Sequence, residues 1–393
     1  MAGKLSKREI EELKAFVQTG NLTATAAKLQ EKLESLEKTP LDIAITGVSG
    51  SGKSSFVNAI RGLRDNDEGA AETGTTQTTM KPNPYTHPRH REVTIWDLPG
   101  TGTPTFQPEK YLKEVNFDWY DFFIIVAATH FTSHDTNLAR EIQKKGKRFY
   151  YVRSKVDNDL KGEGRKKNFN KERSLQKIRE DCIENLRKVG EASPRVFLIC
   201  IWEPANYDFP LLLETLENEL DEQKRHVFTL ALPNISAEIL RKKKAELQKH
   251  ILEVAFMSCA IGAVPLPGLS LVCDVAILVF HMRQYCVAFG LTDESLTRLA
   301  RQVGKPVAEL KSVMKKSSMA SAITKEFVLS LLSRSACGLL MIVEFVLNFV
   351  PVLGSLAGGG ISFLTTRYLL QSFLDDAAED AQKVLTKALE PKA

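Results

Sequence analysis

Residues 41–63, LDIAITGVSGSGKSSFVNAIRGL, decide the fold of this chain. A β-branched apolar run at 41–46 is followed at once by GVSGSGKS (47–54), and SFVNAIRGL then continues with helical periodicity. This is the G-x-x-x-x-G-K-S pattern in its strand–loop–helix context. Its glycines allow positive φ, and its backbone N–H groups and the helix N-terminus form a concave anion site. The segment therefore predicts a site for nucleotide phosphates.

The side chains of this loop have separate predicted roles. Lys53 would reach the β- and γ-phosphates, and the Ser54 hydroxyl would ligate Mg²⁺. A chance match to such a pattern is not rare, so the prediction of nucleotide binding depends on further motifs. The loop residues that we expect to contact the nucleotide are Gly47, Gly50, Ser51, Gly52, Lys53, Ser54 and Ser55.

A second motif follows another apolar strand. Residues 93–96, VTIW, run into Asp97-Leu98-Pro99-Gly100, which is the D-x-x-G pattern of a GTPase second switch. Asp97 would hold Mg²⁺ through water, and the Gly100 N–H would sense the γ-phosphate. The alternative is a plain turn at the end of a strand, because Pro-Gly forms turns anywhere. The spacing after the phosphate loop favours the switch.

A third motif selects the base. FYYVRSKVD (149–157) places Ser154-Lys155-Val156-Asp157 at the end of another apolar strand, with Ser where the guanine motif has Asn or Thr. The Asp157 carboxylate can accept both N1–H and the exocyclic N2–H₂ of guanine, and adenine lacks that donor pair. The Lys155 stem would cover one face of the base. Together the three motifs predict a guanine-nucleotide-binding domain.

Two further apolar runs, 120–130 and 195–201, fit strands that are buried on both faces of a parallel sheet. We expect helices at 171–189 and 209–224. The loop after the last strand should bring Cys200 and Ile201 to the base through their backbone. The predicted fold is an α/β P-loop GTPase domain, a mostly parallel sheet flanked by helices, joined to an α-helical domain.

Composition excludes several other classes of protein. With 393 residues, two domains or one large domain are expected, and 43% hydrophobic with 26% charged residues is typical of a packed globular chain. The 53 basic and 48 acidic residues leave a net charge of +5, which is too balanced to indicate nucleic-acid binding. The six cysteines form no C-x-x-C pair, so no zinc or disulfide pattern is expected. The charged N-terminus lacks an apolar signal, and Ala2 fails the N-myristoylation pattern, so a cytoplasmic location is expected.

The segment between the first two motifs bears on hydrolysis. Residues 68–88 are rich in Gly, Thr and Pro, and one threonine should close on Mg²⁺ when the γ-phosphate is present. Thr79 is our choice, and the competing candidates are Thr75, Thr76 and Thr78. Thr101 follows Gly100, where many small GTPases carry a water-positioning Gln. Hydrolysis should therefore be slow, or should depend on a partner or a second copy.

These motifs and the segments around them resemble the interferon-inducible immunity-related GTPases. The similarity is clear over about residues 10–245, continues through 291–300 and weakens in the last ninety or so residues. Lys53 implies the effector-like branch of that family, because the regulatory branch has methionine there. The similar segments are GVSGSGKSSFVNAIRGL (47–63), EGAAETG with TTM (68–80), WDLPGTGT (96–103), YDFFIIVAATHF (120–131), RSKVD (153–157) and LPNIS (232–236).

The resemblance implies dynamin-like behaviour. It includes GTP hydrolysis to GDP, GTP-dependent self-association through the nucleotide faces, interaction with other family members, and peripheral recruitment to pathogen-containing or other internal membranes in innate immunity. In the family an acid within the first switch assists catalysis across the dimer face. The matching residue here is Gln77, a departure that cannot act as a base. The catalytic candidates are thus Lys53, Gln77 and Thr79, and a slow guanine-nucleotide-dependent scaffold that acts through protein partners remains the alternative.

The remaining chain is expected to be helical. Residues 1–39 form a helical segment, residues 40–228 the GTPase domain and residues 229–393 a C-terminal helical domain. Packing of the N-terminal segment with the C-terminal helices is implied by the resemblance. Residues 254–273 are uncharged, and 336–366 contain one acid. They are either buried core helices or hairpins that contact a membrane, and the basic run 241–244 is either a solvated helix face or a contact with anionic lipid.

Overall fold

A computed structural model describes residues 39–74, 81–101, 107–146, 149–262, 269–315, 320–334 and 354–390. The chain divides into two compact units, and the first of them is Pro40–Ile235. The second contains the described residues from Ser236 onward.

The first unit is built on a six-stranded sheet with the order β2-β3-β1-β4-β5-β6. All neighbouring strands are parallel except β2 and β3, which are antiparallel. The strands are β1 (Leu41–Thr46), β2 (Asn83–Thr86), β3 (Val93–Asp97), β4 (Phe122–Ala127), β5 (Tyr150–Arg153) and β6 (Val196–Leu198).

The central strands are apolar because both of their faces are covered. Every residue of β4 and β5 is buried, which is the pattern expected of strands inside a parallel sheet. Ile45 is paired with Asp97 on one side of β1 and with Ile124 on the other. The carboxyl ends of the parallel strands therefore meet along one edge of the sheet, where ligands of such folds bind.

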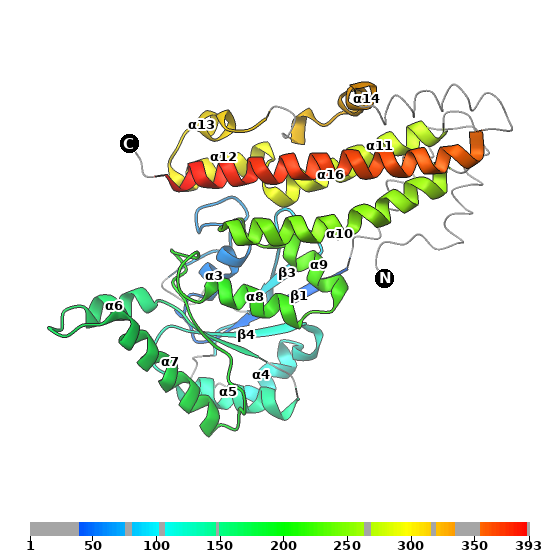
Figure 1. Cartoon of the computed structure of the whole chain (residues 1–393). Helices are drawn as coiled ribbons and strands as arrows, with labels where there is room; N and C mark the ends of the chain where they lie inside the picture. Colours follow the sequence, from blue (N-terminus) through cyan, green and yellow to red (C-terminus); the bar gives the residue numbers. More distant parts are fainter. Residues whose placement is uncertain are drawn as a thin grey trace. The chain divides into compact units, whose positions relative to one another are not determined.

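Helices connect and cover these strands (Figure 1). Side chains fix several helix starts: Thr132 forms a capping box with Asp135 at α5, and Asp221 accepts from two backbone N–H groups at α9. The helices of this unit are α3 (Lys53–Ile60), α4 (Pro108–Glu114), α5 (Ser133–Lys144), α6 (Val156–Glu163), α7 (Lys171–Lys188), α8 (Phe209–Glu219) and α9 (Glu222–Ala231), with a 3₁₀ turn η1 (Phe117–Trp119).

The second unit is helical, and its long helices α10, α11 and α16 pack against one another. A buried polar cluster lies among them, because Ser258 donates to Asp274 and also bonds Thr366 (3.0 Å). Its described elements are α10 (Ala237–Gly262), α11 (Leu269–Phe289), α12 (Asp293–Val303), α13 (Val307–Ser312), η3 (Ala320–Ala322), α14 (Lys325–Arg334) and α16 (Gly354–Leu389).

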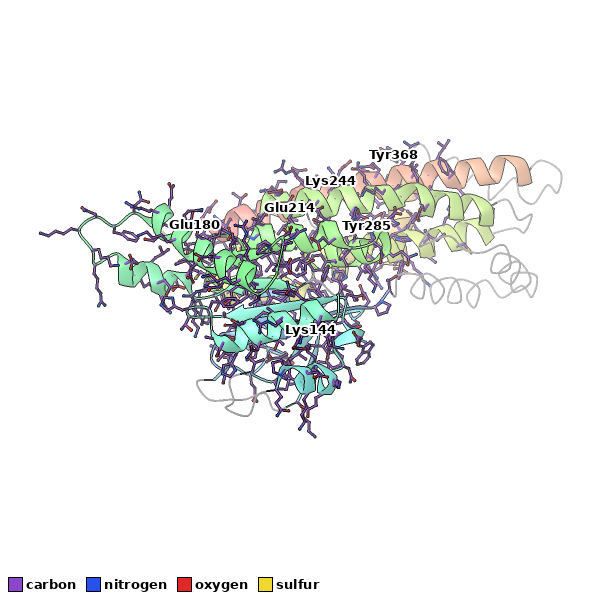
Figure 2. All side chains as sticks on the ribbon, turned by 90° about the horizontal axis from the view of Figure 1, so that it is seen from below. Lys144, Glu180, Glu214, Lys244, Tyr285 and Tyr368 are labelled. Carbon is purple, nitrogen blue, oxygen red and sulfur yellow. The ribbon has the colours of Figure 1, made fainter. Side chains whose placement is uncertain are left out.

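The basic run 241–244 does not form a uniformly solvated face. Lys243 is fully buried, and its ammonium group donates to the Ala288 carbonyl oxygen of α11 at 2.8 Å. Lys244, which is labelled in Figure 2, pairs with Asp375 of α16 at 2.7 Å. Two of the four charges therefore hold helices of this unit together.

The structure confirms the predicted fold class, a mostly parallel sheet flanked by helices and a helical C-terminal region. Three details differ. The edge strand β2 was not predicted, the expected helix 209–224 is divided into α8 and α9, and the expected boundary at 228–229 falls inside α9. Helix α9 packs on β1 and β3, so the first unit extends to Ile235.

Two expectations concern parts of the chain that are not fully described. The predicted helix at 1–38 lies outside the described residues, as do 263–268 and 335–353 within the apolar segments. Among the described residues, one range, Cys273–Val303, which runs from α11 into α12, has the length and hydropathy needed to cross a membrane, and 61% of its most apolar part is buried. A mostly buried core helix of a soluble protein can have the same length and hydropathy.

Candidate nucleotide site

A cavity of about 450 Å³ lies at the carboxyl edge of the sheet in the first unit. Residues from all three sequence motifs line it, together with residues that follow β6 and residues at the start of the first switch. The lining residues are Ser49, Gly50, Gly52, Lys53, Ser54, Ser55, Thr73, Gly74, Gly100, Lys155, Asp157, Asn158, Lys161, Ile201 and Trp202.

The loop between β1 and α3 requires glycine where it turns most tightly. Gly47 has φ +139°, and a Cβ there would lie 2.0 Å from the Val126 carbonyl oxygen. Gly52, with φ +91°, is the N-cap of α3 and accepts the first helical bond from Phe56 N–H at 2.8 Å. Without a side-chain cap, the N-terminal N–H groups of α3 remain available to an anion, as a phosphate site needs.

Lys53 and Ser54 begin α3 at the floor of the cavity. Lys53 is 7% exposed, and burial lowers the pKa of its ammonium group, an effect that the nearby Asp97 carboxylate opposes. The Lys53 ammonium group donates to the Val48 carbonyl oxygen at 3.3 Å. A buried cation favours a polyphosphate, because the charge of the ligand would replace the lost solvation.

Asp97 lies at the end of β3, directly behind Ser54. The Ser54 hydroxyl donates to its carboxylate at 2.7 Å, and Asp97 is 1% exposed. A hydroxyl and a carboxylate in contact at a phosphate loop are hard oxygen donors of the kind that Mg²⁺ takes. These two residues therefore fit the expected metal site.

Gly100 brings the second-switch turn against the phosphate loop. A Cβ at Gly100 would lie 3.2 Å from the Ser49 nitrogen, so the two backbones approach closely. The next residue, Thr101, donates its N–H to the Gly47 carbonyl oxygen at 3.1 Å. Its side chain is 1% exposed and is not part of the cavity lining, so it does not replace a water-positioning Gln there.

The base-side motif is attached to the same loop through two hydrogen bonds. The buried Ser154 hydroxyl donates to the Ser51 carbonyl oxygen at 2.7 Å, and the Lys155 ammonium group donates to the Gly50 carbonyl oxygen at 2.8 Å. Lys155 has φ +57°, a left-handed conformation at the start of α6. This turn lays the Lys155 stem across Gly52, within 3.9 Å of a Cβ placed there.

Asp157 lies in the first turn of α6 and faces the cavity. Lys161, one turn later, is 3.4 Å from its carboxylate. Cys200 is 1% exposed, and burial, together with the nearby Asp157 carboxylate, raises the pKa of its thiol. The contribution of the Cys200 backbone to the base stays a prediction.

A polar network anchors the chain that leads into the first switch. Asp65 accepts from the Ser55 hydroxyl at 3.2 Å and from the Asn58 amide at 2.9 Å. The Asn58 side chain also bonds both backbone groups of Ala71, at 2.6 and 3.1 Å. Thr73 and Gly74 then reach the cavity rim, so α3 fixes where the switch begins.

The structure brings most of the predicted site residues together. Eight of them line the cavity: Gly50, Gly52, Lys53, Ser54, Ser55, Gly100, Lys155 and Asp157. Four lie behind this lining: Gly47, Ser51, Asp97 and Cys200. Gln77 and Thr79, and the competing threonines 75, 76 and 78, lie outside the described residues.

Sequence reasoning missed part of the base side. Trp202 lines the cavity although 66% of it is exposed, and the Ile201 side chain approaches Gly52 to within 3.4 Å of a Cβ placed there. We had expected Ile201 to act through its backbone. Asn158 and Lys161 also line the cavity, and the i,i+4 spacing of Lys161 from Asp157 was the available signal for the second of them.

Comparison with known proteins agrees with this geometry. The model of the family described as Interferon-inducible GTPase (IIGP) matches residues 6–388. This chain belongs to the interferon-inducible GTPase family. It is 45% identical to Interferon-inducible GTPase 5 of Rattus norvegicus over 98% of this chain and 84% of that protein. It is also 36% identical to Interferon-gamma-inducible GTPase 10 of Mus musculus over 98% and 90% of the two chains.

The family membership confirms the resemblance and the expected enzyme class. This member of the interferon-inducible GTPase family is a GTPase of immunity that binds guanine nucleotide. A solved structure of an Era variant from Aquifex aeolicus with GDP and AlF4⁻ is 17% identical, with a TM-score of 0.32, over 55% of this chain and 67% of that one.

Proposed function

We propose that this GTPase binds Mg²⁺-GTP in the cavity at the carboxyl edge of its sheet and hydrolyses it to GDP. It then uses the cycle to control self-association at pathogen-containing or other internal membranes. The observation that carries the nucleotide part is the convergence of Lys53, the Ser54–Asp97 contact and Asp157 on one cavity of about 450 Å³. The membrane and self-association parts rest on the family resemblance.

The roles follow from the chemistry of phosphoryl transfer, which needs positioning and charge stabilisation more than covalent help. Lys53 would neutralise phosphate charge from the floor of the site, and the Gly100 N–H would meet the terminal phosphate. Ser54, Asp97 and Thr79 would hold Mg²⁺, which when bound neutralises charge that develops on the phosphate oxygens. Asp157 would accept the two guanine donors while the Lys155 stem covers the ring.

A single copy of the chain should hydrolyse GTP slowly. Thr101 stands where small GTPases have a water-positioning Gln, and its buried side chain does not reach the cavity. Gln77, in the first switch, could orient water or a partner's nucleotide but cannot accept a proton as a base. The missing group must therefore come from elsewhere, and a second copy that docks on the nucleotide face is the proposed source.

The burial of Thr101 also favours the second candidate function. A guanine-nucleotide-dependent scaffold would bind GTP, order its switches and engage protein partners, with hydrolysis only incidental. Such a protein needs the same phosphate and base contacts but gains nothing from a second copy. The two functions are therefore distinguished by how turnover depends on concentration.

The test is GTP turnover per protein molecule as total protein concentration is raised about fiftyfold with excess Mg²⁺. Self-association that completes the site predicts that specific activity rises several-fold, and the variant Lys53→Ala should stay inactive throughout. A flat, slow rate would contradict the self-activating GTPase and would favour the scaffold. Light scattering of the same samples with GDP and with GTP shows whether assembly accompanies the rise.

A further inference from the structure

Tyr111 connects three parts of the nucleotide-binding unit through one hydroxyl group. It lies on α4, is 7% exposed, and packs in the hydrophobic cluster that contains Leu98. Its hydroxyl is 2.6 Å from the hydroxyl of Thr46, the last residue of β1. The same hydroxyl is 3.0 Å from the carbonyl oxygen of Pro99 in the second-switch turn.

The direction of these two hydrogen bonds is fixed by chemistry. A carbonyl oxygen can only accept, so the single phenol proton of Tyr111 goes to Pro99. Thr46 must then be the donor in the contact with Tyr111. Burial raises the pKa of the Tyr111 phenol far above its ordinary value, so the proton stays in place. The chain of bonds thus runs from Thr46 through Tyr111 to Pro99.

The Pro99 carbonyl and the Gly100 N–H belong to the same peptide group. A trans peptide directs its C=O and its N–H to opposite sides, and no described peptide bond is cis. The carbonyl points toward Tyr111 in the core, so the Gly100 N–H faces away from the core. Gly100 itself lines the nucleotide cavity.

Neighbouring contacts limit how this peptide can move. On one side, Thr101 N–H is held by the Gly47 carbonyl oxygen at 3.1 Å. On the other, a Cβ at Gly100 would already lie within 3.2 Å of the Ser49 nitrogen. Rotation of the peptide is therefore the motion left open, and the Tyr111 hydroxyl opposes it, because rotation would leave the Pro99 carbonyl oxygen without this donor.

We propose that Tyr111 is a positioning residue for triphosphate recognition: its hydroxyl orients the Pro99–Gly100 peptide so that the Gly100 N–H meets the terminal phosphate of GTP. This inference rests on the proposed placement of that phosphate at Gly100. GDP lacks the terminal phosphate, so the contact contributes to GTP binding and not to GDP binding. Tyr111 therefore helps the site to distinguish the two nucleotides without touching either.

The experiment compares Tyr111→Phe with a matched control, Tyr150→Phe. Tyr150 is also buried and donates its hydroxyl to a side chain, Glu219, so this variant likewise loses one phenol hydrogen bond, but not one to the second-switch turn. Affinities for GDP and for a non-hydrolysable GTP analogue are measured with Mg²⁺ in the full-length protein. One lost hydrogen bond predicts about a three- to tenfold loss of analogue affinity in Tyr111→Phe, with GDP affinity changed less than twofold. Tyr150→Phe should leave the ratio of the two affinities at the wild-type value.

Thr46→Val separates the two ends of the bond chain. It removes the donor to the phenol but leaves the bond from Tyr111 to Pro99, so the affinity ratio should change less than twofold. If Thr46→Val changes the affinity ratio as much as Tyr111→Phe does, the effect comes from the contact with β1 and not from the bond to Pro99, and the proposal is overturned. Equal losses of GDP and analogue affinity in Tyr111→Phe, or no change in either, would also overturn it. If the wild-type protein binds neither nucleotide, the proposed function itself fails, which is a distinct result.

Discussion

Ser154 shows how one hydroxyl can couple the base side of the site to the phosphate side. It stands where Asn or Thr is usual in the guanine motif, is fully buried, and donates to the Ser51 carbonyl oxygen at 2.7 Å. A second contact, with the Ala127 carbonyl oxygen, is 3.2 Å long. What the position supplies here is a side-chain hydrogen-bond donor, which an Asn amide or a Thr hydroxyl can also provide.

Ser154→Ala should therefore weaken both stability and nucleotide binding. Loss of a buried hydrogen bond predicts a fall of about 1–3 kcal/mol in the free energy of unfolding. It also predicts several-fold weaker GDP binding, because the base motif is no longer held to the loop. Urea unfolding and GDP titration measure the two effects.

Ser154→Thr is the control for that substitution, since it keeps the hydroxyl and should retain most GDP affinity. If the alanine variant unfolds and binds GDP like the wild type, the coupling through Ser154 is refuted.

For single residues, the sequence predicted those that belong to short motifs with fixed spacing. Lys53, Ser54, Asp97 and Asp157 were found because the loop and strand-end motifs place them regardless of the rest of the chain. Trp202 was not predicted, because its position depends on how the loop after β6 folds back to the cavity. Contacts between distant segments leave no local signature in the sequence.

The β1–loop–α3 element carries the strictest steric demand in the site. Gly47 turns the chain directly against β4, where even a methyl group would lie 2.0 Å from the Val126 carbonyl oxygen. Gly50 also has a positive φ, +76°, but no atom lies within 4 Å of a Cβ placed there. Substitution of Gly50 therefore tests only the energy of a positive φ. Substitution of Gly47 also tests the energy of the steric clash with β4.

We expect Gly47→Ala to lower the free energy of unfolding by more than about 3 kcal/mol, because the backbone must move to admit the methyl group. Gly50→Ala should cost only about 1–2 kcal/mol, the penalty for a left-handed residue. Denaturant unfolding of the two variants measures both values. Equal losses would show that the contact between Gly47 and β4 has no energetic role.

The elements of the sheet were predictable to different degrees. The buried strands β4 and β5 were found because each is a continuous apolar run between turns. The edge strand β2, NPYT, contains proline and few apolar residues, so its residue types do not indicate a strand. It is a strand because it pairs with β3. The break between α8 and α9 was missed, because Asp221 caps a new helix within a stretch of unbroken helical periodicity.

On the scale of the molecule, the chain order of the motifs was sufficient to predict the architecture of the first unit. The phosphate loop, the Asp97 motif and the guanine motif each follow the end of a strand. Such motifs can meet only at the carboxyl edge of a parallel sheet. The helical unit was less predictable. Its apolar helices also carry buried polar groups, such as Asp274 and Lys243, whose partners lie on other helices.

The central claim is that the cavity of the first unit is a guanine-nucleotide site in which Asp157 selects the base. In Asp157→Asn, the amide would accept N1–H and donate to the second carbonyl of xanthine, whereas it mismatches the amino group of guanine. Affinities for GDP, ADP and xanthosine diphosphate are measured by calorimetry in the wild type and in this variant. Glu163→Gln, which makes the same charge change at the far end of α6, is the control.

The account predicts that wild-type protein and the control prefer GDP over xanthosine diphosphate by at least about a hundredfold, the effect of one mispaired charged hydrogen bond. It predicts that Asp157→Asn reverses this preference while ADP binding stays weak in all three proteins. An Asp157→Asn protein that is folded and still prefers GDP would contradict the assignment of the base site.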